Sequence, residues 1–221
     1  MTGRFADRLD AGRLLAKELE TYRAGDAVVL GLARGGVVVG YAVAKELNLP
    51  LRALIVRKVG APRNPELALG AVSETGVRWL DTSLVKATGA SEEYVQGEIA
   101  AQVAEARRRQ QEYASGLGLG LEIVQGRQAI VVDDGIATGA TAIVALRSAR
   151  DLGASEIVLA TPVASTQAVK LLQPAAGRLV VLHVPDPFLA VGFHYQHFDQ
   201  VTDAEVINLL RSASGASETQ R

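Results

Sequence analysis

The chain of 221 residues contains no cysteine. This absence excludes a disulfide framework, a thiolate zinc site and a cysteine nucleophile. Charge of one sign is not in excess either, because 23 lysines and arginines stand against 24 aspartates and glutamates and give a net charge of -1. A non-specific nucleic-acid binder normally carries a positive excess, so we expect no nucleic-acid partner.

Long hydrophobic runs are also missing. No stretch of 18 residues is free of charged or turn-forming residues, so we expect no membrane span. The opening segment Met1–Arg8 is too charged for a signal peptide, which together with the absence of cysteine predicts a cytoplasmic location. The sequence has no G-x-x-x-x-G-K-S/T loop and no G-x-S-x-G elbow, which argues against a P-loop ATPase and a serine hydrolase.

Five short runs rich in valine, isoleucine and leucine lie along the chain. Their side chains are mostly apolar at successive positions rather than at alternate ones, which is typical of strands buried on both faces of a parallel sheet. The runs are Ala27–Leu32, Leu51–Val56, Gln128–Val132, Glu156–Ala160 and Leu179–Val184.

Helical patterns separate these runs. We expect helices over residues 7–22, from Gly36 to the residue before Asn48, from the N-cap Ser91 to an end marked by Arg107–Arg109, and over Thr141–Leu152. This alternation predicts an α/β fold with a doubly wound parallel sheet, in which ligands bind at the carboxyl ends of the strands.

Three segments break the alternation. Gly60–Gly76 contains two prolines and is long for a connection, so we expect a mobile lid. Ser115–Gly126 is glycine-rich and predicts a loop or hairpin, with Glu122–Val124 as a strand. Ser212–Arg221 has no large apolar side chain and is expected to be disordered, which leaves one domain over residues 1–211.

The sharpest feature is the run Ile130-Val-Val-Asp-Asp-Gly-Ile-Ala-Thr-Gly-Ala-Thr141. An apolar strand leads into two carboxylates, then a turn of small residues, then a helix. Such a turn offers unpaired backbone amides and hydroxyls at a helix N-terminus, which is a ready anion site. Asp133 and Asp134 stand beside it, placed to accept hydrogen bonds from sugar hydroxyls or to hold a hydrated cation. A phosphate and a diol side by side indicate a ribose phosphate.

This run resembles the phosphoribosyl-pyrophosphate motif of the type I phosphoribosyltransferases, in which four hydrophobic residues and two acids precede a T-x-G-x-T turn. The resemblance implies the fold of that family, with a small variable hood over about residues 184–200 to which the N-terminus contributes. It implies that Asp133 and Asp134 bind the ribose 2′- and 3′-hydroxyls. The 5′-phosphate would be held by the loop that follows, namely Gly135, Ile136, Ala137, Thr138, Gly139, Ala140 and Thr141.

Two further segments agree with this resemblance in order and spacing. Arg34, Gly35 and Gly36 follow the first expected strand, where the family has its pyrophosphate loop. The glycines let backbone amides approach a diphosphate, and the arginine adds a bidentate donor. Arg57 and Lys58 resemble the Arg-Lys step of the adenine and orotate enzymes, which lies beside the pyrophosphate. The long loop after them would close over the site and exclude water.

The segment Val184–Tyr195 resembles the hood of the hypoxanthine/guanine enzymes, where a proline-aspartate step leads to an aromatic residue that stacks on the purine. By this likeness Phe188 binds the base. Ala137 indicates otherwise, because the 6-oxopurine enzymes have an acid there, whereas Asp-Asp-x-x-Ala-Thr-Gly is the arrangement of the adenine enzymes. The acceptor base stays open, with a purine favoured.

The resemblance thus implies transfer of phosphoribose from Mg-phosphoribosyl pyrophosphate to a nitrogenous base by a homodimer, with Mg²⁺ bound mainly through the pyrophosphate substrate. Asp133, Asp134 and Lys58 would carry catalysis, and the candidates for the general acid or base are Asp134, Glu66 and Glu74. From its N-terminal helix to the hood, the chain is similar to a group of bacterial phosphoribosyltransferases with no settled substrate.

The alternative function is a non-catalytic regulatory protein that senses phosphoribosyl pyrophosphate or a nucleotide. The Arg57-Lys58 step and the near-neutral charge favour the enzyme. No protein metal site is expected, because nothing arranges His194, His197 and Asp199 into a tetrahedral cage. The run Arg107–Arg109 is interpreted as the solvated end of a helix.

Overall fold

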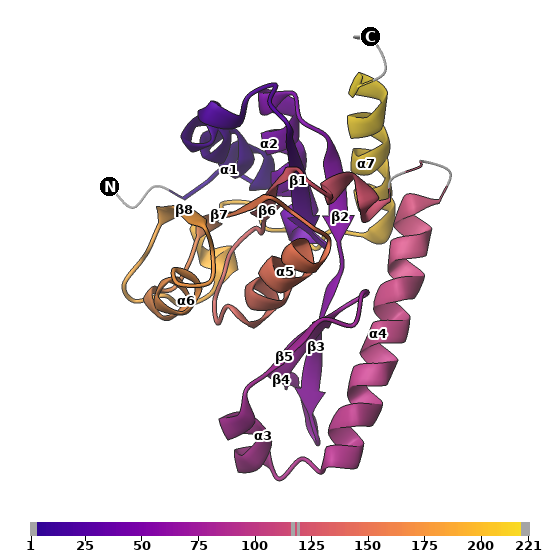
Figure 1. Ribbon diagram of the computed structural model, residues 1–221. Helices are drawn as coiled ribbons and strands as arrows, with labels where there is room; N and C mark the ends of the chain where they lie inside the picture. Colours follow the sequence, from indigo (N-terminus) through magenta and orange to yellow (C-terminus); the bar gives the residue numbers. More distant parts are fainter. Residues whose placement is uncertain (1–3, 116–117, 119, 218–221) are drawn as a thin grey trace.

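The structure is a computed structural model that describes residues 4–115, 118 and 120–217. Its centre is a five-stranded parallel sheet with the strand order β2-β1-β6-β7-β8 (Figure 1). The strands are β1 (Ala27–Leu32), β2 (Leu51–Leu54), β6 (Gln128–Val132), β7 (Glu156–Val163) and β8 (Arg178–His183). All five expected strands are present, and the predicted α/β class with a parallel sheet is confirmed.

Helices cover both faces of this sheet. The helices are α1 (Arg8–Glu18), α2 (Gly35–Leu47), α5 (Ala140–Asp151), α6 (Thr166–Leu172) and α7 (Asp203–Ser217). On one face, alternate strand residues such as Val29 and Ile130 pack with α1, α2 and α7. On the other face, Val28, Leu30 and Val131 pack with α5 and α6. Both sets are apolar, which is why the strands have continuous rather than alternating hydrophobic patterns.

A small antiparallel sheet occupies the segment that the sequence predicts as a lid. Its strands are β3 (Val56–Ala61), β4 (Asn64–Ser73) and β5 (Arg78–Leu80), in the order β3-β4-β5. The prediction of a loop over Gly60–Gly76 was therefore wrong. Pro62 and Arg63 form the turn, and the inner residues of β4 are buried because they pack on a helix that follows.

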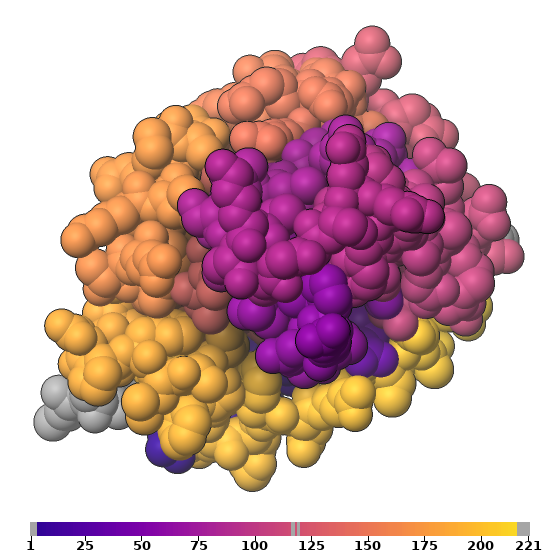
Figure 2. Space-filling view, turned by 90° about the horizontal axis from the view of Figure 1, so that it is seen from below, coloured from indigo at the N-terminus to yellow at the C-terminus, as the bar shows by residue number. Residues whose placement is uncertain are grey.

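That helix belongs to a lobe that the small sheet forms with α3 (Thr82–Thr88) and α4 (Glu92–Ala114). Val59, Leu69 and Val72 of the sheet pack with Val95 and Ile99 of α4 in a separate apolar cluster. Figure 1 shows the lobe below the parallel sheet, with α4 running along both parts. Figure 2 shows residues of this lobe, in purple and magenta, in the middle of the lower face, with later segments in orange and yellow around them.

Three smaller predictions also need correction. Leu121–Val124 is a 3₁₀ helix, not the strand expected at Glu122–Val124. Residues 212–217, expected to be disordered, continue α7, because the helix buries Val206 and Leu210 against the core upstream. Residues 218–221 lie outside the described part. The helix α4 runs to Ala114, so Arg107–Arg109 lie inside it and not at its end.

Candidate functional site

The two loops that the sequence singles out meet at the carboxyl edge of the parallel sheet. The strands β1 and β6 are hydrogen-bonded neighbours, with Gly31 opposite Val132. Their C-terminal ends therefore bring the loop after Leu32 beside the loop after Val132, although about 100 residues separate the two in sequence.

Gly35 and Gly36 make this contact sterically possible. A Cβ atom on Gly35 would lie 1.9 Å from Oδ2 of Asp134, and one on Gly36 would lie 2.5 Å from the carbonyl oxygen of Val132. A side chain at Gly35 would displace the Asp134 carboxylate, and one at Gly36 would collide with backbone atoms. The peptide bond between Ala33 and Arg34 is cis, and Gly35 begins α2. The two glycines thus let one loop lie directly against the acidic end of the other.

The loop from Gly135 to Thr141 has the features of an anion site. Within the described residues, no protein acceptor binds the backbone amides of Ala137, Thr138 and Gly139. Ala137 and Thr138 are exposed, and Gly139 has a φ of +88° immediately before α5. Open amides at a helix N-terminus attract phosphate because both their hydrogens and the helix dipole favour negative charge.

The rear of this loop is fixed by the next strand. The Ile136 amide donates to the Val163 carbonyl at 2.9 Å, and the Ser165 amide donates to the Ile136 carbonyl at 2.9 Å. The Ser165 hydroxyl donates to the Ala137 carbonyl at 2.6 Å. Because its carbonyl groups are held from behind, the loop keeps its amides turned outward without a bound anion.

Asp133 and Asp134 lie between the two loops. Burial raises the pKa of Asp133 well above its usual range, and the neighbouring Asp134 charge raises it further. Burial also raises the pKa of Asp134, but Arg8 opposes this change through an ion pair with 2.7 Å between Nε and Oδ2. No protein N–H within the described residues donates to the second oxygen of either acid. These oxygens suit sugar hydroxyls or a hydrated cation.

Arg34 lines a cavity of about 390 Å³ beside the acid pair, together with Arg8, Gly35 and Phe198. Within the described part of the chain, no hydrogen bond or ion pair holds the Arg34 guanidinium. A partly buried and unpaired guanidinium in a cavity is suited to bind an anion bidentately.

Arg57 and Lys58 lie in β3 and not in a loop. The Arg57 Nε donates to Oε1 of Gln102 on α4 at 2.6 Å, and burial lowers the pKa of the Arg57 guanidinium. Lys58 is exposed. Among the residues that the structure describes, neither cation forms an ion pair with Asp133 or Asp134. The place of the Arg-Lys step beside the diphosphate remains a prediction.

The C-terminal segment expected as the hood reaches the phosphate loop. Val191 packs so closely on Gly135 that a Cβ on this glycine would lie 2.3 Å from Cγ1 of Val191. The Phe5 amide donates to the His194 carbonyl, which joins the N-terminal segment to this region. The Phe188 ring lies 5.7 Å from the His194 ring, centroid to centroid. Burial lowers the pKa of His194.

The remaining acid candidates have different surroundings. Glu66 is exposed on β4. Glu74, just beyond β4, is buried, and neither of its carboxylate oxygens has a hydrogen-bond partner within the described residues. Burial raises the pKa of Glu74 to about 7. His194, His197 and Asp199 do not converge, and within residues 4–115, 118 and 120–217 no three histidine or acidic side chains form a metal cluster.

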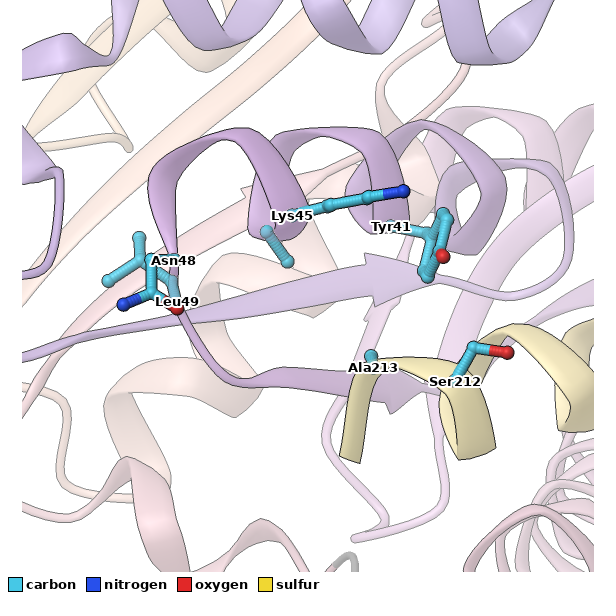
Figure 3. Close-up of a pocket in the computed structure, with 7 residues that line it drawn as sticks. Tyr41, Lys45, Asn48, Leu49, Ser212 and Ala213 are labelled. Atoms are coloured by element: carbon cyan, nitrogen blue, oxygen red, sulfur yellow. The ribbon is translucent and has the colours of Figure 1, made fainter. Parts of the chain in front are cut away.

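A second cavity of about 250 Å³ lies between α2 and α7 (Figure 3). Tyr41 and Lys45 line it from α2, Asn48 from the C-terminal cap of that helix, and Ser212 and Ala213 from α7. These α2 residues belong to the C-terminal half of the helix, whereas the glycine loop forms its N-terminus. The cavity is thus separate from the site at the sheet edge.

Within the described residues, no helix is both long and apolar enough to span a bilayer.

Fold and site together are those of an α/β protein with open backbone amides at a helix N-terminus beside a pair of acids. The sequence matches the phosphoribosyl transferase domain over residues 6–196. Two curated relatives from Mycobacterium tuberculosis, strains H37Rv and CDC 1551, are provisionally named as phosphoribosyl transferases. Each is 43% identical over 209 residues, or 95% of this chain. The chain therefore belongs to the phosphoribosyl transferase family.

The chain matches only part of its curated relatives, but it matches nearly all of a solved structure. The chain spans only 47% of the length of the curated relatives. The crystal structure of TT1426 from Thermus thermophilus is 42% identical, with 95% of this chain and 98% of that chain covered and a TM-score of 0.78. A solved structure of similar size thus matches most of this chain.

Sequence reasoning missed two residues that hold Asp134, namely Arg8 and Tyr195. The Tyr195 hydroxyl donates to the backbone carbonyl of Asp134 at 2.5 Å. Burial raises the pKa of this phenol, so it stays protonated as a donor. Neither residue lies near Asp134 in the sequence, and Arg8 is 126 positions away from it. No local spacing could therefore have signalled these contacts.

Proposed function

We propose that the chain transfers phosphoribose from Mg-phosphoribosyl pyrophosphate to a nitrogenous base, with inversion at C1 and release of pyrophosphate. The observation that carries this proposal is the convergence of the acid pair, the glycine loop and the open amides at one sheet edge. A phosphate, a ribose diol and a diphosphate find complementary groups there, in the order in which the donor presents them.

Each part of the donor has its partners in the chain. The 5′-phosphate binds the amides of Ala137, Thr138 and Gly139, supported by the hydroxyls of Thr138 and Thr141. The ribose hydroxyls donate to Asp133 and Asp134. These interactions fix the ribose so that C1 faces the acceptor.

The leaving diphosphate binds Arg34 and the amides of Gly35 and Gly36. Negative charge grows on the diphosphate as the bond to C1 breaks, so donors already in place stabilise the transition state more than the ground state. Lys58 contributes a further cation once β3 and the bound donor approach each other. When bound, Mg²⁺ neutralises the diphosphate and is held mainly by it, and the free oxygens of Asp133 and Asp134 suit its hydration shell.

The acceptor is a base, with a purine favoured, and Phe188 stacks on it. The hood over about residues 184–200 closes this end of the site, with the N-terminal segment attached to it through Phe5. One domain over residues 1–211, a homodimer and a cytoplasmic location, without nucleic-acid or membrane partners, remain predictions.

The test is incubation of the purified protein with Mg-phosphoribosyl pyrophosphate and a panel of purine, pyrimidine and nicotinic bases, with products read by mass spectrometry. A nucleotide formed by the wild type and lost in Asp134→Asn supports the transferase and identifies its base. If no base yields a nucleotide while the donor still raises the melting temperature, the chain is a sensor of the donor and the transferase proposal is wrong.

A further inference from the structure

Arg8, the first residue of α1, reaches the acid pair from a part of the chain that carries no ligand motif. Its Nε lies 2.7 Å from Oδ2 of Asp134, and its side chain is only 11% exposed. Most arginine–carboxylate pairs at protein surfaces are exposed and contribute little to stability. This pair is shielded from water and involves one of the two acids expected to bind ribose.

Two further contacts fix the Arg8 guanidinium. Its Nη1 donates to the backbone carbonyl of Asp199 at 2.8 Å, and its central carbon lies 3.8 Å from the centre of the Phe198 ring. A hydrogen bond at one edge and an aromatic ring over one face restrict a planar guanidinium to one orientation. The C-terminal segment thus holds Arg8 while Arg8 holds Asp134.

The pair also lies directly against the glycine loop. A Cβ on Gly35 would be 3.0 Å from the Arg8 Nε and 1.9 Å from Oδ2 of Asp134. Tyr195 holds the Asp134 backbone carbonyl from another side. Asp134 is therefore fixed at both its side chain and its backbone by residues outside its own loop, and Arg8 is the one that decides which carboxylate oxygen remains open.

We propose that Arg8 is a positioning residue of the donor site. By engaging Oδ2 it directs Oδ1 of Asp134 toward the ribose hydroxyls, and through Phe198 and Asp199 it links this geometry to the C-terminal segment. The proposal rests on the proposed function, because it takes Asp134 as a ribose ligand. The Arg8 side chain also lines the 390 Å³ cavity with Arg34, so its charge faces the space beside the diphosphate loop.

The experiment measures binding of Mg-phosphoribosyl pyrophosphate by isothermal titration calorimetry to the wild type, Arg8→Met and Arg8→Lys. Loss of a charge-assisted hydrogen bond predicts a dissociation constant about tenfold higher in Arg8→Met. Arg8→Lys keeps a cation near Oδ2 and should recover most of this loss. Arg23→Met is the matched control, because Arg23 also pairs with an acid, Glu20, but in the open, and should bind as the wild type does.

A double variant separates positioning from a general loss of structure. If Arg8 acts through Asp134, then Arg8→Met changes donor binding less than about twofold in the Asp134→Asn background, because coupled residues are not additive. An undiminished tenfold effect in that background would overturn the proposal. So would wild-type binding by Arg8→Met, or equal losses in Arg8→Met and Arg8→Lys.

A fold check and a second variant keep the test decisive. Circular dichroism shows whether Arg8→Met folds. If it does not fold, Phe198→Leu is measured instead, because this substitution removes the ring over the Arg8 guanidinium and leaves the ion pair with Asp134. We expect the donor affinity of Phe198→Leu to be about threefold weaker than that of the wild type. An unchanged affinity would overturn the inference. A wild type that binds the donor but forms no nucleotide refutes only the transferase, whereas one that binds no donor refutes both proposals.

Discussion

The parallel sheet and the small antiparallel sheet differ in the surroundings of their charged side chains. At the edge of the parallel sheet, Asp133 and Asp134 are sheltered from water and Arg8 is fixed beside them. In the small sheet, Lys58 is exposed and Arg57 bonds to a neutral glutamine. Parallel strands end together, so their edge collects loops from distant parts of the chain, whereas a hairpin brings together only neighbours in sequence.

Glycine positions show where the chain is closely packed. Gly35 and Gly36 have backbone or carboxylate atoms where a Cβ would stand, and a Cβ on Gly70 of the small sheet would lie 2.1 Å from the carbonyl oxygen of Trp79. Gly97, on the exposed face of α4, has no described atom outside its own helix within 4 Å of that position. A side chain at the sheet edge should therefore destabilise the protein, whereas one at Gly97 is tolerated.

The largest effect is expected for Gly36→Ala. Its Cβ would lie 2.5 Å from the Val132 carbonyl oxygen, and two backbones cannot separate without disturbing the sheet edge. We expect a loss of about 3 kcal/mol in the free energy of unfolding, measured by urea denaturation. Gly97→Ala is the control and should gain about 0.5–1 kcal/mol, because alanine favours a helix. Equal stability of the two variants would contradict the packing difference.

Glu74 sharpens the comparison, because it is a buried acid at the junction of the two sheets, and its carboxylate has no hydrogen-bond partner among the described residues. Its pKa of about 7 in the folded protein lies above the usual 4.5, so the folded state binds its proton more tightly than the unfolded state. The stabilisation from the neutral carboxyl is complete below about pH 4.5 and is lost as the pH rises through 7.

The rise of this pKa from 4.5 to about 7 corresponds to a total loss of about 3 kcal/mol, at 1.36 kcal/mol for each pKa unit. Arg107, which donates to the backbone carbonyl of Glu74, offers the carboxylate no hydrogen bond. Urea denaturation at pH 5 and pH 8 should show the decline in the wild type and a flatter dependence in Glu74→Gln. The same decline in both proteins would show that another group titrates.

Asp133→Asn and Asp134→Asn test the sheet edge by function. Each variant removes a carboxylate that would accept a hydrogen bond from a ribose hydroxyl. The loss of one charged hydrogen bond costs about 1.5–3 kcal/mol, so turnover should fall at least tenfold. Steady-state rates with the base found in the product screen provide the measurement. Asp26→Asn, which alters an exposed ion pair with Arg127, should keep the wild-type rate. Near wild-type turnover in both site variants would refute the ribose assignment.

The smallest effect is expected in the antiparallel sheet. Lys58 is exposed, so a contact with the diphosphate would be screened by water and worth about 1 kcal/mol or less. Lys58→Ala should raise KM for the donor about threefold and leave the melting temperature unchanged. Lys86→Ala on α3 should change neither. A decrease of more than a hundredfold in kcat/KM for the donor in Lys58→Ala would mean that β3 closes over the donor as a catalytic element.

How far the sequence predicts this molecule depends on where each contact comes from. Ala27–Leu32 and Gln128–Val132 match their strands because residues on both faces are apolar and give an unambiguous signal. Residues 60–76 were misread because Pro62, Pro65 and Gly70 weaken the strand pattern, although their neighbours pack on α4. The motif residues of the site lie in one local run and were recognisable, whereas Arg8 reaches Asp134 only through the folded chain.

The central claim is that the edge of the parallel sheet binds the donor. A crystal structure of the protein with Mg-phosphoribosyl pyrophosphate tests it most directly. We predict the 5′-phosphate at the amides of Ala137 to Gly139 and the ribose hydroxyls on Asp133 and Asp134, with the diphosphate beside Arg34. A donor bound elsewhere, for example in the cavity between α2 and α7, would contradict the account.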